Sequence, residues 1–240
     1  MRILPFLTAA GVACLLFATV AWAADLVVIR SNAPGIARGS LIPAGTELEI
    51  PAGKSVTLIS PSGTPETLKG PFKGKVGARV TGASEDGERL VRALAKLVDD
   101  DKDGATLGAM RAVGDKGGVP TDLWVINVTM SGTYCVVGDQ PTRLWRPKSD
   151  KKGALSLKLV PLSKRVKVSW PAGEATIPWP DGIQLRDRGN YLVQLKGSLN
   201  AIKFQIRMLP EKLASAAHRV VWMARKGCDR QAGLLMDRLR

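Results

Sequence analysis

Histidine is almost absent from this chain, and its scarcity excludes several classes of active site. His218 is the only histidine in 240 residues, so sites built from several histidines and most histidine-containing catalytic triads lack the residues they need. The sequence motifs of dinucleotide, nucleoside-triphosphate, zinc-protease and nucleophile-elbow sites are absent too. His218 itself lies in a predicted helix, where a packing or surface role is expected. The sequence therefore predicts a protein that is not an enzyme and uses no cofactor.

Long apolar stretches are also lacking after the first 23 residues, so no membrane span is expected in the mature chain. The first 23 residues differ: Arg2 is followed by an almost wholly apolar stretch over residues 3–20, and Ala21-Trp22-Ala23 fits a signal-peptidase site. This pattern predicts a signal peptide over residues 1–23, a mature chain that begins at Ala24 and a periplasmic location. An uncleaved N-terminal anchor is the alternative.

Cysteine is rare, and only Cys135 and Cys228 remain once the signal peptide with Cys14 is removed. In an oxidising compartment an isolated pair of cysteines usually forms a structural disulfide. The alternative is a reactive Cys135 assisted by His218. A nucleophilic thiol needs a base and an orienting group around it, whereas residues 134–137 have the pattern of a half-buried strand. The sequence therefore predicts a Cys135–Cys228 disulfide.

Acidic residues are outnumbered: 21 Asp and Glu stand against 35 Lys and Arg, a net charge of +14. Such an excess favours anionic partners through long-range attraction. In the periplasm these are lipid headgroups, lipopolysaccharide, acidic proteins or glycans, and no nucleic-acid partner is expected. The alternative is that the charge mainly keeps the protein soluble.

The basic residues are densest in one stretch, where Asp150 is the only acid and Trp145 lies among them. Basic residues interleaved with aromatics can bind anionic polymers by charge and stacking. Equally, strands with inward aromatics and solvated lysines produce the same pattern. The candidate anionic-partner surface comprises Arg143, Arg146, Lys148, Lys151, Lys152, Lys158, Lys164, Arg165 and Lys167.

Aromatic residues divide the mature chain, because Phe72 is the only one before residue 120. Large aromatic side chains anchor cores, so two differently built parts are expected. Over residues 24–83, short β-favouring stretches at 26–29, 47–50 and 56–59 alternate with turns rich in Pro and Gly. This rhythm predicts a small all-β module.

The same module has a recurring order of glycines, prolines and apolar residues. The residues concerned are Gly39-Ser40-Leu41, Ile42-Pro43-Ala44-Gly45-Thr46-Glu47-Leu48, Ile50-Pro51-Ala52-Gly53, Val56, Leu58, Ser62-Gly63 and Leu68-Lys69-Gly70-Pro71. In this pattern the segment resembles the FecR-like domain. The resemblance covers only this N-terminal part and implies a periplasmic β module for interaction. Regulatory members of that family carry a membrane helix and a cytoplasmic anti-sigma segment. This chain shows neither, so the signalling role is not implied.

Residues 84–120 are predicted to be a connector that contains one amphipathic helix and then an acidic loop. Asp99, Asp101, Asp103 and the glycine that follows match the opening of an EF-hand calcium loop. The later ligand positions of that loop hold Leu107 and Met110, which supply no side-chain oxygen. The three aspartates are thus a weak calcium candidate, and a solvated acidic loop is the main expectation.

Residues 121–209 are predicted to form a β-sandwich whose core is mostly filled by tryptophans. A change to helical periodicity over residues 210–240 predicts two C-terminal helices, hinged near Lys226-Gly227 and packed on the sandwich. The disulfide would fasten these helices to the sheets. The eight expected strands are 123–129, 132–137, 142–145, 154–159, 165–170, 174–177, 191–195 and 202–208.

The sequence as a whole predicts a mainly β, non-enzymatic periplasmic interaction protein. Its expected partner is an envelope protein, at or near a signalling or secretion complex. The alternative function is binding to an anionic envelope surface, such as lipopolysaccharide, acidic lipid or peptidoglycan. A hydrolase that uses scattered carboxylates is the least favoured hypothesis.

Overall fold

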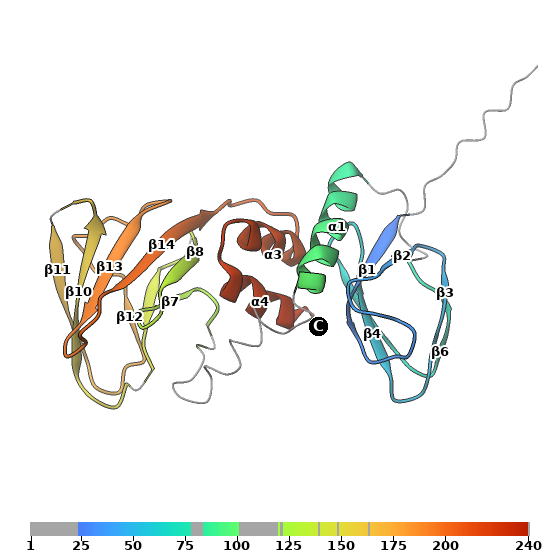
Figure 1. Ribbon diagram of the computed structural model, residues 1–240, viewed down its shortest axis with the longest axis horizontal. Coiled ribbons are helices and arrows are strands. Elements are labelled where there is room, and N and C mark those ends of the chain that lie inside the picture. Colours follow the sequence, from blue (N-terminus) through green and yellow to red (C-terminus); the bar gives the residue numbers. More distant parts are fainter. Residues whose placement is uncertain are drawn as a thin grey trace, which may run out of the picture.

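The computed structural model describes residues 24–77, 84–100, 120, 122–138, 140–147, 149–162 and 164–239. Within these ranges the fold is mainly β, with several sheets and three helices, two of them near the C-terminus (Figure 1). This confirms the expected mainly β class. Across the same ranges no helix has the length and apolarity to cross a membrane. The predicted signal peptide, Lys148, Asp101 and Asp103 lie outside the described residues.

The N-terminal part contains two small sheets. The strands β2, β1, β4 and β5 form an antiparallel sheet in that order, and β3 pairs with β6. The strands are β1 (Asp25–Ser31), β2 (Leu41–Pro43), β3 (Glu47–Ile50), β4 (Ser55–Ile59), β5 (Pro65–Lys69) and β6 (Phe72–Lys75). The short strands β2, β5 and β6 were not predicted, because their few apolar residues are separated by turn-forming ones.

Strand β1 is buried on both faces. Leu26 and Val28 belong to the cluster of buried residues between the two N-terminal sheets. Val27 and Ile29, which point to the opposite face, belong to a second cluster. Successive side chains of a strand alternate between faces, so a continuous apolar stretch is what a strand covered on both sides requires.

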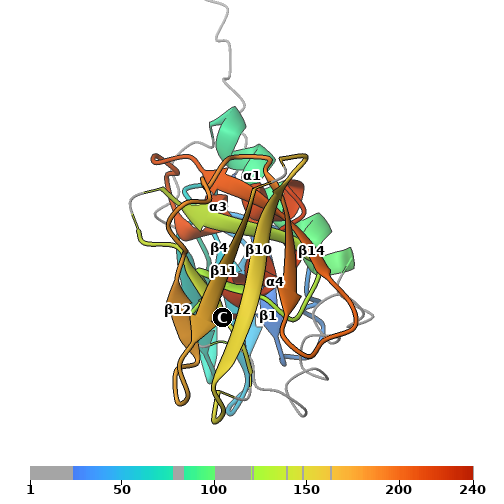
Figure 2. The same ribbon diagram turned by 90° about the vertical axis from the view of Figure 1, so that its left-hand side faces the viewer.

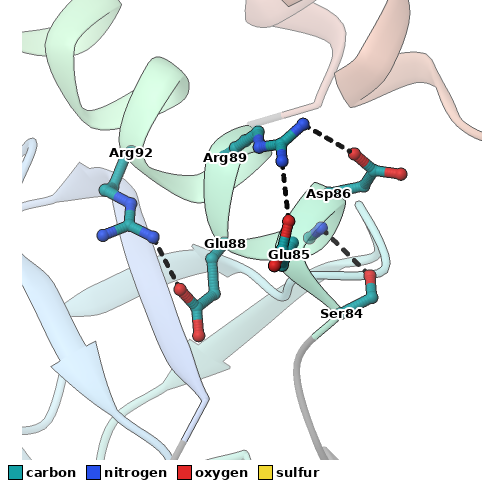
Figure 3. Close-up of polar contacts among 7 residues, drawn as sticks. Ser84, Glu85, Asp86, Glu88, Arg89 and Arg92 are labelled. Carbon is teal, nitrogen blue, oxygen red and sulfur yellow. Dashed lines mark hydrogen bonds and ion pairs between the residues drawn. The ribbon is translucent and has the colours of Figure 1, made fainter.

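Helix α1 (Glu85–Asp100) covers the second face of β1. The Ser84 hydroxyl accepts a hydrogen bond from the Gly87 amide at 3.1 Å, which satisfies one free donor of the first turn (Figure 3). On the solvent side, Arg89 contacts Glu85 at 2.7 Å and Arg92 contacts Glu88 at 2.6 Å. Exposed pairs of this spacing contribute roughly 0.3–0.5 kcal/mol each. The acidic groups at the start of α1 are thus partnered within the helix.

The buried side of α1 packs against β1 and α3 (Ala216–Arg225), and α3 packs in turn against α4 (Asp229–Arg238). One cluster of buried residues combines Leu94 and Val98 of α1, Val220 of α3 and Met236 of α4 with the outer face of the N-terminal sheet. Figure 1 shows α1 between that sheet and the two C-terminal helices. The helices therefore join the two β-rich ends of the molecule.

Two further sheets follow along the chain. The larger sheet has the order β11-β10-β13-β14-β8, with β14 and β8 parallel, and the smaller has the order β12-β9-β7. The strands are β7 (Val125–Asn127), β8 (Gly132–Val137), β9 (Arg143–Trp145), β10 (Gly153–Val160), β11 (Arg165–Trp170), β12 (Thr176–Pro178), β13 (Asn190–Leu195) and β14 (Ile202–Leu209).

Both of these sheets contribute to one core. The fully buried Trp170 lies in it, and Tyr191 stacks on Phe204 with ring centroids 5.5 Å apart. Trp145 is also buried in this part of the fold, and Trp179 packs on the core. The tryptophans are not confined to this core, however: Trp124 and Trp222 pack against the helical cluster instead.

Two connections fasten α4 to β8. The predicted Cys135–Cys228 disulfide is present and joins residues 93 apart in sequence. Beside it, the buried Gln231 side chain accepts from the Cys135 amide at 2.6 Å and donates to the carbonyls of Cys135 and Leu123, each at 2.8 Å. These bonds satisfy backbone groups of Cys135 on β8 and of Leu123 before β7 that would otherwise be buried without partners.

Both tyrosines of the chain are held in their protonated form. Burial raises the pKa of Tyr134 to about 12, and the positive charge of Arg230 only partly opposes this. Burial also raises the pKa of Tyr191, whose hydroxyl accepts from the Arg186 amide at 2.9 Å.

Near pH 10, the usual pKa of tyrosine, we expect less tyrosinate absorbance from the folded than from the unfolded protein, because burial raises the pKa of both tyrosines. Because the folded-state pKa of Tyr134 is raised to about 12, its contribution to stability is complete below pH 10 and declines as the pH rises towards 12. The contribution of Tyr191 has the same sign, because its pKa is also raised. The measurement is an ultraviolet pH titration of folded and urea-unfolded protein. Normal titration of either tyrosine with the near-ultraviolet circular dichroism intact would contradict the burial argument.

The turn between β4 and β5 contacts the start of α3 at Gly63. A Cβ atom placed on Gly63 would lie 2.0 Å from Oγ of Ser215. Gly53 has a similar positive φ, 74° against 80°, but nothing lies within 4 Å of its Cβ position.

We expect Gly53→Ala to reduce the unfolding free energy by about 1 kcal/mol, the cost of a positive φ. Gly63→Ala should cost about 1–3 kcal/mol more, because the contact with α3 is overpacked. Urea unfolding of the two variants measures the difference. Equal losses would show that the β4–β5 turn does not hold α3.

Candidate anionic-partner surface

The larger C-terminal sheet contains no acidic residue in any of its five strands. The same strands contain five basic residues. We call them the cationic face, and they are Lys158, Arg165, Lys167, Lys203 and Arg207.

All five basic side chains lie on the same side of the sheet, as the strand register requires. Lys158 on β10 pairs with Arg165 on β11 and, across the other edge, with Leu192 on β13, which in turn pairs with Lys203 on β14. Neighbours one position along the strands, such as Leu157, are buried in the core instead. Basic side chains from three strands, β11, β10 and β14, therefore lie on the outer side, with the uncharged β13 between β10 and β14.

The cationic face is open to solvent along most of its width. Arg165, Lys167 and Lys203 are exposed, and Lys158 and Arg207 are half-buried. Across the described ranges none of the five forms an ion pair. In Figure 2, β10 and β11 lie at the front with no helix drawn before them. Like charges on adjacent strands repel one another, so binding of an anion to this face would reduce the repulsion.

Eight of the nine basic residues expected from the sequence are described, and they lie on several different elements. Lys158, Arg165 and Lys167 lie on the cationic face. Lys164 lies in the turn before β11, and Lys151 and Lys152 lie in the segment before β10, all exposed.

Arg143 and Arg146 make internal contacts and are not part of the cationic face. The Arg143 guanidinium donates to the Thr176 hydroxyl on the neighbouring strand β12. The Arg146 guanidinium lies 5.0 Å from the ring centroid of buried Trp170 and donates to the carbonyls of Lys151 and Pro171. Arg146 thus holds together the loops on either side of the β10–β11 hairpin.

Two residues of the face, Lys203 and Arg207, were missed by the sequence analysis. They lie far along the chain from the dense basic stretch. Their strand pairs with β13, and the local sequence does not indicate that pairing. Their signal was available in the alternation of Lys203, Gln205 and Arg207 with the buried Phe204 and Ile206.

The residues considered for chemistry have structural partners. Cys135 is in the disulfide and has no free thiol. Nδ1 of His218 lies 2.8 Å from Oγ of Ser215, the N-cap residue of α3, three positions earlier. Asp99 lies in the last turn of α1. Among the described residues no group of three or more His, Cys, Asp or Glu side chains could hold a metal.

Comparison with known proteins identifies no relative: no protein-family model, no curated protein and no solved structure matches this chain. The resemblance of residues 24–83 to the FecR-like domain therefore stays a prediction. The case for a function rests on the geometry of the cationic face.

Arg146 makes internal contacts, whereas Lys167 is exposed, so the two residues should differ in their effect on stability. Arg146→Met should reduce the unfolding free energy by about 1–3 kcal/mol, because two carbonyls lose a charged donor and Trp170 loses its cation contact. Lys167→Met, on the open face, should change stability by no more than about 0.5 kcal/mol. Thermal unfolding of both variants decides this. If Arg146→Met is as stable as wild type, the contacts of Arg146 with Trp170 and the two carbonyls do not stabilise the fold, and Arg146 would be available to bind an anion.

Proposed function

We propose that this protein is a non-enzymatic periplasmic interaction protein that binds an anionic envelope surface through the cationic face. The observation that carries the proposal is a five-stranded sheet whose strands contain no acidic residue and whose five basic residues lie on the outer side. None of these five forms an ion pair within the described residues. The net charge of +14 adds long-range attraction. The two C-terminal sheets, which share a core, support a β-sandwich as the binding module.

The spacing of the charges favours an extended anion over a single small one. Lys158 and Lys203 lie on strands separated by β13, which places their backbones roughly 10 Å apart at about 4.8 Å per strand. Arg165 and Lys167 extend the array along β11. A membrane surface or a polyanion presents repeated negative groups at such intervals, and its binding weakens with salt.

A second candidate is docking on an envelope protein by strand addition at β11. Among the described strands, β11 pairs only with β10 and is an edge of its sheet. An open edge offers backbone groups to a partner strand. Charged side chains such as Arg165 and Lys167 also protect edges from self-association, so the edge alone favours this function less than the face favours the first. The FecR-like module would support either function as an interaction domain.

The test compares two variants with the same change in charge. Lys158→Glu, Lys167→Glu and Lys203→Glu together remove the centre of the cationic face. The control variant combines Lys54→Glu, Lys69→Glu and Lys75→Glu, three exposed positions in the N-terminal part. Each lysine near an anionic surface contributes on the order of 1 kcal/mol, so the face variant should bind dextran sulfate roughly a hundredfold more weakly.

The control variant should keep nearly all of the wild-type affinity, measured by fluorescence anisotropy at low and high salt. Equal losses in both variants would show that net charge acts without a site, and the proposal would fail. Capture of one envelope protein that survives high salt and the face variant would instead favour docking at β11.

A further inference from the structure

Two apolar side chains lie among the basic residues of the cationic face. Leu192 lies in register between Lys158 and Lys203, and Val160 lies two residues beyond Lys158 on β10. Both are half-buried, and neither belongs to the core beneath the sheet or to the residues packed against that core. A face with both cationic and apolar side chains suits an amphiphile better than a fully hydrophilic anion.

One end of this sheet carries a fully exposed leucine. Leu199, in the turn between β13 and β14, is 99% exposed, compared with 47% for Leu162 in the turn between β10 and β11. Leu195 at the end of β13 pairs with Leu155 near the start of β10, so Leu199 lies at the end where β10 begins. The antiparallel order places Leu162 at the opposite end.

Basic side chains surround the end with Leu199. Lys196 lies three residues before it, and the Lys196 amide donates to the Ala154 carbonyl at 2.8 Å. Lys151 and Lys152 lie in the segment that enters β10 at this end, and all three lysines are exposed. Asp150 and Glu174 are the acidic residues in the adjoining loops. Exposure of a leucine side chain to water is unfavourable, and its insertion into hydrocarbon would lower the free energy by removing its apolar area from water.

We propose that the cationic face is a peripheral membrane-binding surface that docks on a bilayer containing acidic phospholipid. Leu199 inserts among the acyl chains, and Lys151, Lys152 and Lys196 lie at the level of the headgroups. The sheet inclines on the membrane so that Lys167 and Lys158 face the phosphates. This inference rests on the function proposed above, because it needs the cationic face, and it adds the class of ligand and the orientation.

The experiment measures binding of the purified protein to vesicles of mixed phosphatidylglycerol and phosphatidylcholine, with pure phosphatidylcholine vesicles and soluble dextran sulfate as comparisons. Leu199→Ser should weaken binding to the acidic vesicles roughly tenfold or more, and leave binding to dextran sulfate unchanged. Leu199→Trp should retain or strengthen vesicle binding. Leu162→Ser is the matched control at the opposite end and should change neither.

The outcomes separate this inference from the function on which it rests. Equal vesicle binding by wild type and Leu199→Ser, or a loss with Leu162→Ser instead, would overturn the proposed orientation. Binding to dextran sulfate but not to acidic vesicles would overturn the membrane as ligand and leave an anionic polymer or an acidic protein as the partner. If the triple Lys→Glu variant of the face binds both probes like wild type, the proposed function itself fails. Circular dichroism spectra confirm that each variant is folded.

Discussion

The fold depends on covering the second face of β1. Leu26 and Val28 are buried between the N-terminal sheets, but Val27 and Ile29 on the other side need a separate cover. Helix α1 supplies it, and its own apolar residues then complete a core with α3 and α4. Removal of apolar surface from water stabilises the folded chain. Because the helices bury apolar surface of both β-rich ends, one layer of helices holds these ends together.

The disulfide and Gln231 transmit this constraint to the larger C-terminal sheet. Both fasten α4 to β8, which is the edge strand nearest the helices. The remaining strands extend away from that edge towards β11 (Figure 1). Because the helical layer is fixed at β8, none of the described helices lies over the outer side of β10 and β11.

Local pattern predicts the strands and helices of this chain better than it predicts the site. Strands β8 and β11 have the bounds that their alternation indicates, and Cys135 pairs with Cys228 as expected. The site depends on which strands are neighbours, and alternation carries no information about that. Lys203 lies on the same face as Lys158 because both are in register with Leu192 on the strand between them. Arg146, five residues before the exposed Lys151, contacts Trp170 instead.

The side chains on the outer face of β14 change from apolar to charged where the helices cease to cover the strand. Lys203 is exposed, Arg207 is half-buried opposite Cys135, and Leu209 is buried in the helical cluster. Along one face of one strand the side chains therefore change from charged to apolar as the helices approach. Apolar residues occur where burial stabilises them, and the charged outer positions of β10 and β11 accordingly lie where none of the described helices covers the sheet. Within the part of the chain that the structure describes, Arg165, Lys167 and Lys203 therefore stay in contact with solvent.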